Sequence, residues 1–277
     1  MQHLLADWKN VESLIKKNDV ILGLDYDGTL VPIAEHPYLA RLSLEGRESL
    51  RELSLLSDVL TVIIMSGRGL EELKRMVGIL PGFYYAGNHG FEMEGPLIHF
   101  VHPEALETKE LMGYIEKQLC QALRVFPDIF VENKIFTLSV HYRQLPEEKS
   151  EPAKQIFLEI LRPYTNSSRV ILTEGKKVWE IRPAIDWNKG MAFSHLLSQL
   201  PIRTFLKPLS LSIGDDQTDE DVFKAIMPSG IGIKVTQNAN EFSHARYYLR
   251  SPDEVLDFLG RFANLVREKR KIFHAWH

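Results

Sequence analysis

Two clusters of acidic side chains follow short apolar segments, and they are the residues best suited to chemistry. Asp25 and Asp27 come directly after the apolar run at 20–24, and a denser acidic run at 215–221 follows a later apolar segment. Carboxylates brought together repel one another unless a cation lies between them. Oxygen-only ligands favour a hard divalent ion, and phosphate chemistry favours Mg²⁺. The same ion would neutralise the repulsion between a carboxylate nucleophile and an anionic phosphate.

A hydroxyl group and a lysine occupy two further positions suited to phosphate. The tripeptide Ser66-Gly67-Arg68 follows the apolar run at 59–65, and Lys189 stands in the first turn of a helix expected to start near Asn188. A lysine in that turn opposes the helix dipole, at a typical cost of about 0.3–1 kcal/mol. A lysine directed at a phosphate has a reason to stand there.

Each of these patterns also has a purely structural interpretation. Asp27-Gly28 is a common turn pair, the acids at 215–221 suit the start of a helix, and Lys189 could be an ordinary surface residue. The combination favours a site, because in open parallel sheets ligands bind beyond the carboxyl ends of the strands. We therefore predict one site built from all of these residues.

Short continuous apolar runs alternate with helical patterns in the first and last thirds of the chain. The runs lie at 20–24, 59–65, 84–87, 209–213 and 230–235. Such runs are typical of strands buried on both faces. Their alternation with amphipathic segments predicts an α/β fold with a Rossmann-like, doubly wound parallel sheet. The first twenty residues predict an amphipathic helix.

The middle of the chain has a different pattern. Residues 137–143 alternate between apolar and polar, and residues 170–183 predict a hairpin that turns near Glu174-Gly175. One-sided strands indicate an antiparallel sheet with helices on one face. We therefore predict an α+β domain inserted into the core. The predicted core is 1–102 with 182–277, and the predicted inserted domain is 103–181.

Composition excludes several classes of partner. The formal net charge is −4, from 33 basic and 37 acidic side chains, so the chain lacks the basic field that nucleic acid requires. No apolar run is long enough to span a bilayer, and the first nineteen residues lack the pattern of a secretory signal. The single cysteine, Cys120, is expected to be a buried helix residue and suits a reducing compartment. The expectation is a cytoplasmic protein with no membrane or nucleic-acid partner.

Four motifs, taken in order, resemble those of the haloacid dehalogenase (HAD) superfamily of phosphohydrolases. They are DYDGTL at 25–30, SGR at 66–68, the lysine at 189 and GDDQTDED at 214–221. The segment between the second and third motifs resembles the C2-type cap domain of that superfamily. From about 21 to about 255 the chain is similar to trehalose-6-phosphate phosphatases. The narrower likeness rests on LDYDGTLVPI, GNHG at 87–90, VENK at 131–134, HYR at 141–143, GKKVWEIRP at 175–183 and GDDQTDED.

The resemblance implies roles for the residues of the core. Asp25 would attack phosphorus and form an aspartyl-phosphate, and Asp27 would act as general acid and then as general base. Ser66, Gly67 and Lys189 would hold the phosphoryl oxygens. These roles agree with covalent catalysis by a carboxylate together with charge neutralisation.

The resemblance also implies a Mg²⁺ site. Its ligands would be Asp215, the carboxylate of Asp25 and the backbone carbonyl of Asp27. Asp216 or Asp219 would orient bound waters or add to the metal site. The partner of this site would be a small-molecule sugar phosphate.

Four polar residues of the inserted segment are candidates for contacts with the sugar. In the family, a Gly-Lys-x-x-x-Glu stretch of the cap contacts the sugar, and here it would supply Lys176 and Glu180. Four residues apart on a strand, both would point to one face. Glu132 and Arg143 match other polar positions of the cap. A surface cross-strand pair is the alternative interpretation.

Three core residues complete the set of candidate substrate contacts. Arg68 could lie near the phosphate or clamp the cap. Asn88 stands where members of the family often carry an acidic residue, and it still offers a sugar donor and acceptor groups. His89 could be a hydrogen-bonding residue at a strand end.

The predicted function is Mg²⁺-dependent hydrolysis of trehalose 6-phosphate. A phosphatase for another sugar phosphate, such as sucrose phosphate or a glycosyl-phosphoglycerate, would carry the same core motifs, and only Lys176 and Glu180 favour trehalose 6-phosphate. A phosphomutase would need an extra arginine cluster for a second phosphate. A non-catalytic sugar-phosphate sensor would usually lack Asp25 or Asp27, and both are present.

Overall fold

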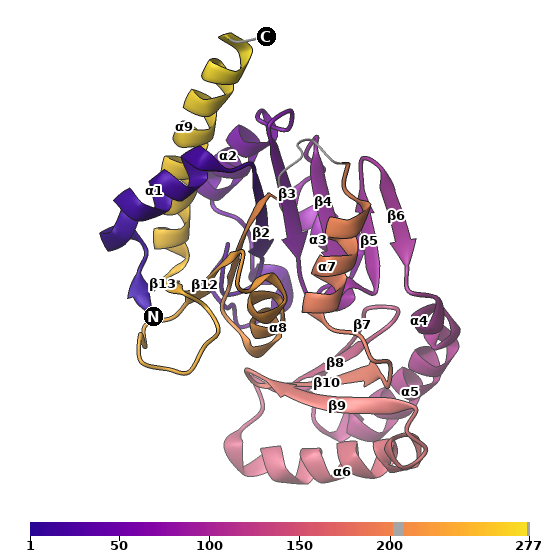
Figure 1. The fold of residues 1–277 in the computed structure, drawn as a ribbon. Coiled ribbons are helices and arrows are strands. Elements are labelled where there is room, and N and C mark those ends of the chain that lie inside the picture. The colour runs from indigo at the N-terminus through magenta and orange to yellow at the C-terminus, as the bar shows by residue number, and fades with distance from the viewer. Residues whose placement is uncertain (202–207, 276–277) are drawn as a thin grey trace. The chain divides into compact units, whose positions relative to one another are not determined.

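The computed structural model describes residues 1–201 and 208–275 (Figure 1). The chain forms two compact units, one of residues 1–100 and 187–277 and one of residues 101–186. The sequence analysis expected the inserted unit to begin at residue 103, two residues later than observed. It expected the core to resume at residue 182, five residues earlier than observed. In the described residues, no helix is both long enough and apolar enough to cross a membrane.

A nine-stranded sheet forms the centre of the first unit (Figure 1). In spatial order from β1 at one edge to β4, every pair of neighbouring strands is parallel. The next strand, β5, pairs antiparallel with β4. This arrangement confirms the predicted α/β class. The strands, in the order in which they lie side by side, are β1 (Gln2–His3), β13 (Tyr247–Leu249), β12 (Ile231–Val235), β11 (Leu209–Gly214), β2 (Val20–Asp25), β3 (Leu60–Met65), β4 (Phe83–Gly87), β5 (Glu92–Gly95) and β6 (Ile98–Val101).

Helices cover both faces of this sheet, so the sheet is doubly wound. Successive strand residues point to opposite faces. Leu22 therefore packs in one core cluster and its neighbour Ile21 in the other. The helices of the first face are α1 (Trp8–Lys17), α2 (Leu44–Ser54), α3 (Leu70–Val77) and α9 (Pro252–Ala275), and those of the second are α7 (Lys189–Gln199) and α8 (Gln217–Ile226).

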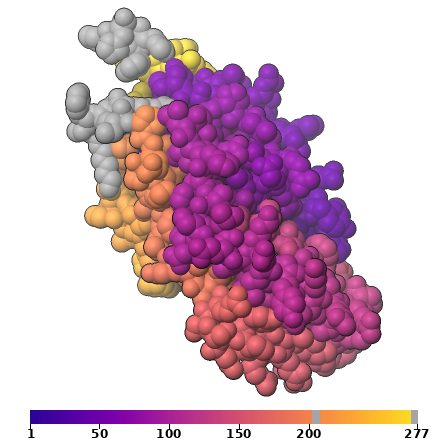
Figure 2. All heavy atoms as spheres, turned by 90° about the vertical axis from the view of Figure 1, so that its right-hand side faces the viewer, coloured from indigo at the N-terminus to yellow at the C-terminus, as the bar shows by residue number. Residues whose placement is uncertain are grey.

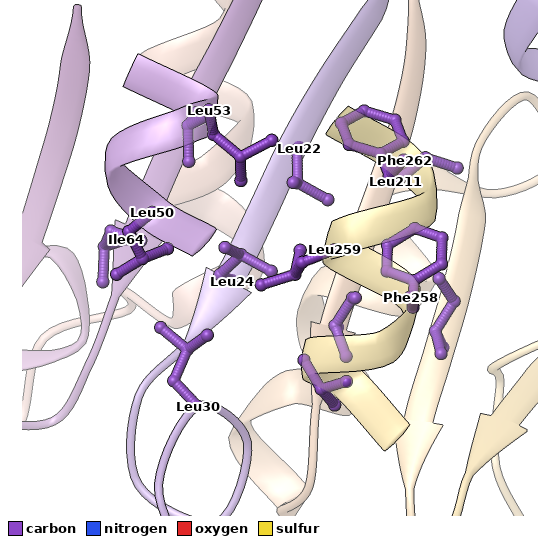
Figure 3. Packing of buried hydrophobic residues seen from close by; sticks show 14 of the residues in the cluster. Leu22, Leu24, Leu30, Leu50, Leu53, Ile64, Leu211, Phe258, Leu259 and Phe262 are labelled. Carbon is purple, nitrogen blue, oxygen red and sulfur yellow. The ribbon is translucent and has the colours of Figure 1, made fainter. Parts of the chain in front are cut away.

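The larger core cluster lies between β2 and α9. Figure 3 shows Leu22 and Leu24 on the strand facing Leu259 and the rings of Phe258 and Phe262 on the helix. All five side chains are at most 1% exposed. A strand buried on both faces has to be apolar throughout, which explains the continuous run at 20–24. Figure 2 shows all heavy atoms from the side on which β6 lies in Figure 1.

The N-terminal segment differs from its prediction as one long helix. Gln2 and His3 form β1, which pairs in parallel with Tyr247 and Tyr248 at the edge of the sheet. A short 3-10 helix, η1 (Leu5–Asp7), leads into α1, which covers only part of the predicted span. The edge of β13 offers unpaired backbone groups, and pairing with them overrides local helix propensity.

The second unit contains a four-stranded antiparallel sheet, as expected for an α+β domain. Leu138, Val140, Trp179 and Ile181 pack from one face of this sheet against two helices. Its strands, in pairing order, are β7 (Phe130–Asn133), β8 (Leu138–His141), β10 (Val178–Pro183) and β9 (Val170–Gly175). Its helices are α4 (Pro103–Glu107), α5 (Lys109–Ala122), η4 (Leu123–Val125) and α6 (Glu147–Asn166).

Two local predictions in this unit were wrong. The β9–β10 hairpin turns at Lys176-Lys177 instead of near Glu174-Gly175, because Glu174 pairs with the buried Trp179 and extends the strand. Lys176 therefore lies in the turn, outside β10. Cys120 is exposed. It follows Leu119, the last residue of the buried stripe of α5, and one residue further turns the side chain by about 100° around the helix.

The packing of β2 yields a prediction about stability. Replacing Leu22 with Ala should lower the free energy of unfolding of the core unit by about 2–5 kcal/mol, because a fully buried leucine leaves a cavity. Urea unfolding followed by tryptophan fluorescence measures this change. Leu44→Ala is the matched control, because Leu44 is 87% exposed and its loss should cost at most about 0.5 kcal/mol. Equal losses for both variants would contradict the assignment of the core.

Candidate active site

The strand order brings the predicted motifs to one edge of the core sheet. β11, β2, β3 and β4 are neighbours, and their carboxyl ends lie side by side because the strands are parallel. Asp25 is the last residue of β2, Asp215 follows β11, Ser66 follows β3 and Asn88 follows β4. The sequence-predicted core residues therefore share this edge.

Three carboxylates converge at the end of β2. Ligand oxygens of Asp25, Asp215 and Asp219 all lie within 4.8 Å of one another. Burial raises the pKa of Asp25 to about 7, and Asp215 adds to this shift while Lys189 opposes it. The Oδ2 atom of Asp25 is buried and has no hydrogen-bond partner. A buried carboxylate oxygen without a partner, next to further carboxylates, fits the needs of a hard divalent cation.

Lys189 is the cation that the protein itself supplies to this cluster. Its Nζ lies 2.7 Å from Asp25 Oδ1 and 2.5 Å from Asp219 Oδ1, and the side chain is 2% exposed. Burial alone would lower the pKa of Lys189, but the charges of Asp219 and Asp25 outweigh burial and raise it above its ordinary value. The lysine therefore stays charged inside the site. It opens α7, whose N-cap is Asn188, as expected from the sequence.

The acidic run at 215–221 both starts a helix and lines the site. Asp216 caps α8 by accepting the N–H groups of Thr218 and Asp219 at 2.8 and 3.2 Å. The Oδ2 atom of Asp219 accepts the N–H groups of Asp215 and Asp216 at 2.9 and 3.1 Å, while its Oδ1 faces Lys189. The structural interpretation of this motif is thus confirmed, and the same run also contributes Asp215 and Asp219 to the carboxylate cluster. Asp219 orients Lys189 and the turn before α8.

Asp27 is held by Arg68. Arg68 Nε and Nη2 donate to the two carboxylate oxygens of Asp27 at 2.6 and 2.8 Å, a bidentate fork. Further donors of Arg68 go to Glu72 Oε1 at 2.7 Å and to the carbonyl of Pro37, in η2 (Pro37–Leu39), at 2.8 Å. The sequence placed Arg68 near phosphate or against the cap; its observed contact with Asp27 was not foreseen. A Cβ on Gly28 would lie 2.3 Å from Asp215 Oδ2, so the Asp27 turn borders the carboxylate cluster.

Ser66 and Gly67 connect Arg68 with His89 through hydrogen bonds and close packing. The hydroxyl oxygen of Ser66 accepts the N–H of Arg68 at 3.2 Å, and the Ser66 carbonyl accepts the N–H of His89 at 2.9 Å. The His89 imidazole is so close to Gly67 that a Cβ on this glycine would lie 2.7 Å from its Nε2. Asn88 donates its amide N–H to Glu92 Oε1 at 2.7 Å.

Two buried acids near the site have partners that the sequence analysis did not predict, Glu92 and, within the acidic run at 215–221, Glu220. Glu92 accepts the N–H of Leu70 at the start of α3 at 2.8 Å, and burial raises its pKa. Glu220 accepts from Lys234 Nζ at 3.0 Å and from the N–H of His244 at 2.8 Å. The lysine within the otherwise apolar stretch at 230–235 was the available signal, because a lysine in a buried strand needs an acidic partner.

The candidate sugar contacts of the second unit fall into two groups. Glu132 and Glu180 both pair with Ser139 from opposite sides, so they form a row on one face of the sheet. Lys134, which the sequence analysis did not single out, lies 3.7 Å from Glu180. Arg143 and Lys176 meet near the β9–β10 turn, where Arg143 Nη2 donates to the carbonyl of Lys176 at 2.6 Å.

Comparison with known proteins identifies the family. The family model described as trehalose-phosphatase matches residues 23–253. Trehalose-phosphate phosphatase B from Arabidopsis thaliana is 36% identical over 267 residues, which cover 92% of this chain and 68% of that protein. The chain belongs to the trehalose-phosphatase family. The sequence resemblance to this family is thereby confirmed.

Solved structures show the same fold. The C-terminal domain of a trehalose-6-phosphate phosphatase from C. albicans superposes with a TM-score of 0.76 at 24% identity, covering 92% of this chain and 96% of that chain. A haloacid dehalogenase-like hydrolase from B. subtilis superposes with a TM-score of 0.53 at 14% identity, covering 87% of this chain and 98% of that chain. At these identities the likeness concerns the fold. The chain is therefore a trehalose-phosphatase family member with a HAD-like core.

The Lys189 contacts yield a second prediction. Replacing Lys189 with Met should lower the free energy of unfolding by about 3–5 kcal/mol, because removing one partner of a buried ion pair leaves the other uncompensated. Urea unfolding measures the loss. Lys16→Met removes only the exposed pair with Glu12, so it should leave the urea midpoint almost unchanged. A Lys189 variant as stable as the Lys16 control would show that the buried contacts do not form.

Proposed function

We propose that this protein hydrolyses trehalose 6-phosphate to trehalose and phosphate in a Mg²⁺-dependent reaction. The observation that carries the proposal is Asp25, fixed through one oxygen by Lys189 and left without a partner at the other, in a member of the trehalose-phosphatase family. A carboxylate held in this way can serve as a nucleophile toward phosphorus. The single cysteine supports a cytoplasmic location.

In the first half of the reaction, Asp25 attacks the phosphorus of the substrate. A bond forms between a carboxylate oxygen and phosphorus, and the bond from phosphorus to the sugar oxygen breaks. Asp27 gives its proton to the departing sugar oxygen. Lys189, Ser66 and the backbone of Gly67 hold the phosphoryl oxygens, whose charge is spread over three atoms in the transition state.

In the second half, water hydrolyses the aspartyl-phosphate. Asp27 takes a proton from the water, the water oxygen bonds to phosphorus, and the bond to Asp25 breaks to give free phosphate. The fork of Arg68 fixes the position of the Asp27 carboxyl group during this step. Asp27 must leave part of this fork to carry the proton that it donates in the first half.

The acidic cluster is the place for Mg²⁺. Asp25 and Asp215 would hold the ion with the backbone carbonyl of Asp27, and Asp219 is close enough to contribute. When bound, the ion supplies positive charge that offsets the carboxylates and the phosphate. Asp216, whose Oδ1 caps α8, supports the position of the turn.

The inserted unit would act as the cap that selects the sugar. Glu132, Glu180 and Lys134 present acceptors and donors from the row on one sheet face, and sugar hydroxyls need both. Lys176 and Arg143 would add charged donors from the turn of the hairpin.

The proposed substrate is tested by phosphate release with and without Mg²⁺. We expect trehalose 6-phosphate to be hydrolysed with a kcat/KM at least about tenfold above those for sucrose 6-phosphate and glucose 6-phosphate, and chelation of Mg²⁺ to abolish turnover. The Asp25→Asn variant controls for contaminating phosphatases. Preference for another sugar phosphate would replace the substrate while keeping the chemistry. Failure to turn over any phosphomonoester would favour a non-catalytic sensor.

The role of the cap is tested at Lys176. Lys176→Ala should lower kcat/KM for trehalose 6-phosphate by roughly 10- to 100-fold, the effect of losing a hydrogen bond from a charged donor. Turnover of p-nitrophenyl phosphate, which has no sugar, should stay within about twofold. Lys177→Ala is the matched control from the same turn, because the Lys177 ammonium already pairs with Glu147. Equal losses on both substrates would mean that Lys176 does not recognise the sugar.

A further inference from the structure

Three consecutive residues after β4 have left-handed backbone conformations. The φ angles are 49° at Asn88, 56° at His89 and 91° at Gly90. Non-glycine residues adopt this conformation rarely and mostly singly. Such strain persists only where surrounding contacts enforce it, and it concentrates at functional sites. The turn η3 (Asn88–Gly90) therefore needs an explanation.

Backbone hydrogen bonds tie this turn to the phosphate-binding segment after β3. The N–H of Asn88 donates to the carbonyl of Arg68 at 2.6 Å, and the N–H of His89 donates to the carbonyl of Ser66 at 2.9 Å. These bonds run between neighbouring strand ends, beyond the last ladder pair of Met65 with Ala86. These two hydrogen bonds therefore fix the position of the turn relative to Ser66 and Arg68.

Side chains fix the two ends of the turn. Glu92 accepts the Asn88 amide at 2.7 Å, and the indole N–H of Trp187 donates to the Gly90 carbonyl at 3.1 Å. A Cβ on Gly90 would lie 2.1 Å from the Cβ of Ala192 on α7, so the turn is also packed against that helix. Together these contacts hold His89 in its strained conformation.

The imidazole of His89 lies against the segment after β3 that is proposed to bind phosphate. It contacts Gly67, which follows β3. β2 lies between β3 and β11, and neighbouring strands are about 4.8 Å apart. The ring therefore lies beside Gly67 after β3, one strand away from Asp25 at the end of β2.

We propose that His89 is a further phosphoryl-binding residue, held by the strained turn so that its imidazole N–H donates to an oxygen of the bound phosphate. This inference rests on the proposed phosphatase function. It adds one hydrogen-bond donor to those of Ser66, Gly67 and Lys189. It also explains why the strained turn is present, because that conformation positions the imidazole. An imidazole N–H is a suitable donor to an anionic oxygen.

The test is the affinity of the Mg²⁺-loaded protein for inorganic phosphate and orthovanadate, measured by calorimetry without turnover. His89→Asn removes the imidazole while keeping a residue type that tolerates the left-handed conformation. We expect both anions to bind roughly tenfold or more weakly, as for loss of a hydrogen bond to a charged group. The melting temperature and the affinity for Mg²⁺ should stay unchanged. His99→Asn, at a histidine whose side chain is 79% exposed, should bind both anions as the wild type does.

A second variant guards against a folding defect at position 89. Trp187→Phe keeps His89 but removes the donor to the Gly90 carbonyl, so it should loosen the turn. Phosphate binding should weaken, but by a smaller factor than in His89→Asn. Unchanged phosphate affinity in both variants would overturn the proposal. A fall in Mg²⁺ affinity alone would also overturn it, because His89 would then act on the acidic turn. A wild type that binds neither anion would instead refute the proposed function.

Discussion

The site depends on one buried interaction, the contact of the Lys189 ammonium with Asp25 and Asp219. Three carboxylates that meet at one point repel one another, and burial raises the pKa of Asp25 and Asp219. Lys189 lies 2.7 Å from Asp25 and 2.5 Å from Asp219, and it keeps its charge despite being 2% exposed. One cation offsets only part of the negative charge. The remaining charge, with the free oxygen of Asp25, is what a divalent ion would balance.

The fold places this lysine through close packing of helices. α7 carries Lys189 and α8 carries Asp219, and the two helices pack on the same face of the sheet. A Cβ on Gly190 would lie 2.2 Å from the carbonyl oxygen of Asp221, so only glycine permits the approach that brings the ammonium to Asp219. β2, the central strand, presents Asp25 to the same point. The apolar cores on both faces of the sheet therefore hold the end of β2 and the starts of α7 and α8 close together. Their side chains Asp25, Lys189 and Asp219 then lie within hydrogen-bonding distance.

The sequence was sufficient to predict the fold class and the convergence of Asp25, Asp215 and Lys189. Continuous apolar runs mark parallel strands, and the residues after such strands must meet at one edge. A local sequence pattern does not reveal which residues far apart in the chain will contact each other. Hence the fork between Arg68 and Asp27, and the burial of Glu220 against Lys234, came only from the structure.

Local errors have equally physical causes. The hairpin turns at Lys176-Lys177 because burying Trp179 opposite Glu174 prolongs β9 as far as Gly175, the glycine that suggested a turn. β1 forms because an open sheet edge was available, which no property of residues 1–20 reveals.

The most direct test of the central claim is chemical trapping of the phosphorylated nucleophile. The protein would be mixed with trehalose 6-phosphate and Mg²⁺, quenched in acid, reduced with borohydride and digested for peptide mass spectrometry. The account predicts that one aspartate, Asp25, is recovered as homoserine from wild-type protein quenched during turnover, and that an Asp25→Asn variant yields no homoserine. Recovery of unmodified Asp25 from protein quenched during rapid turnover, or reduction at another carboxylate, would contradict it.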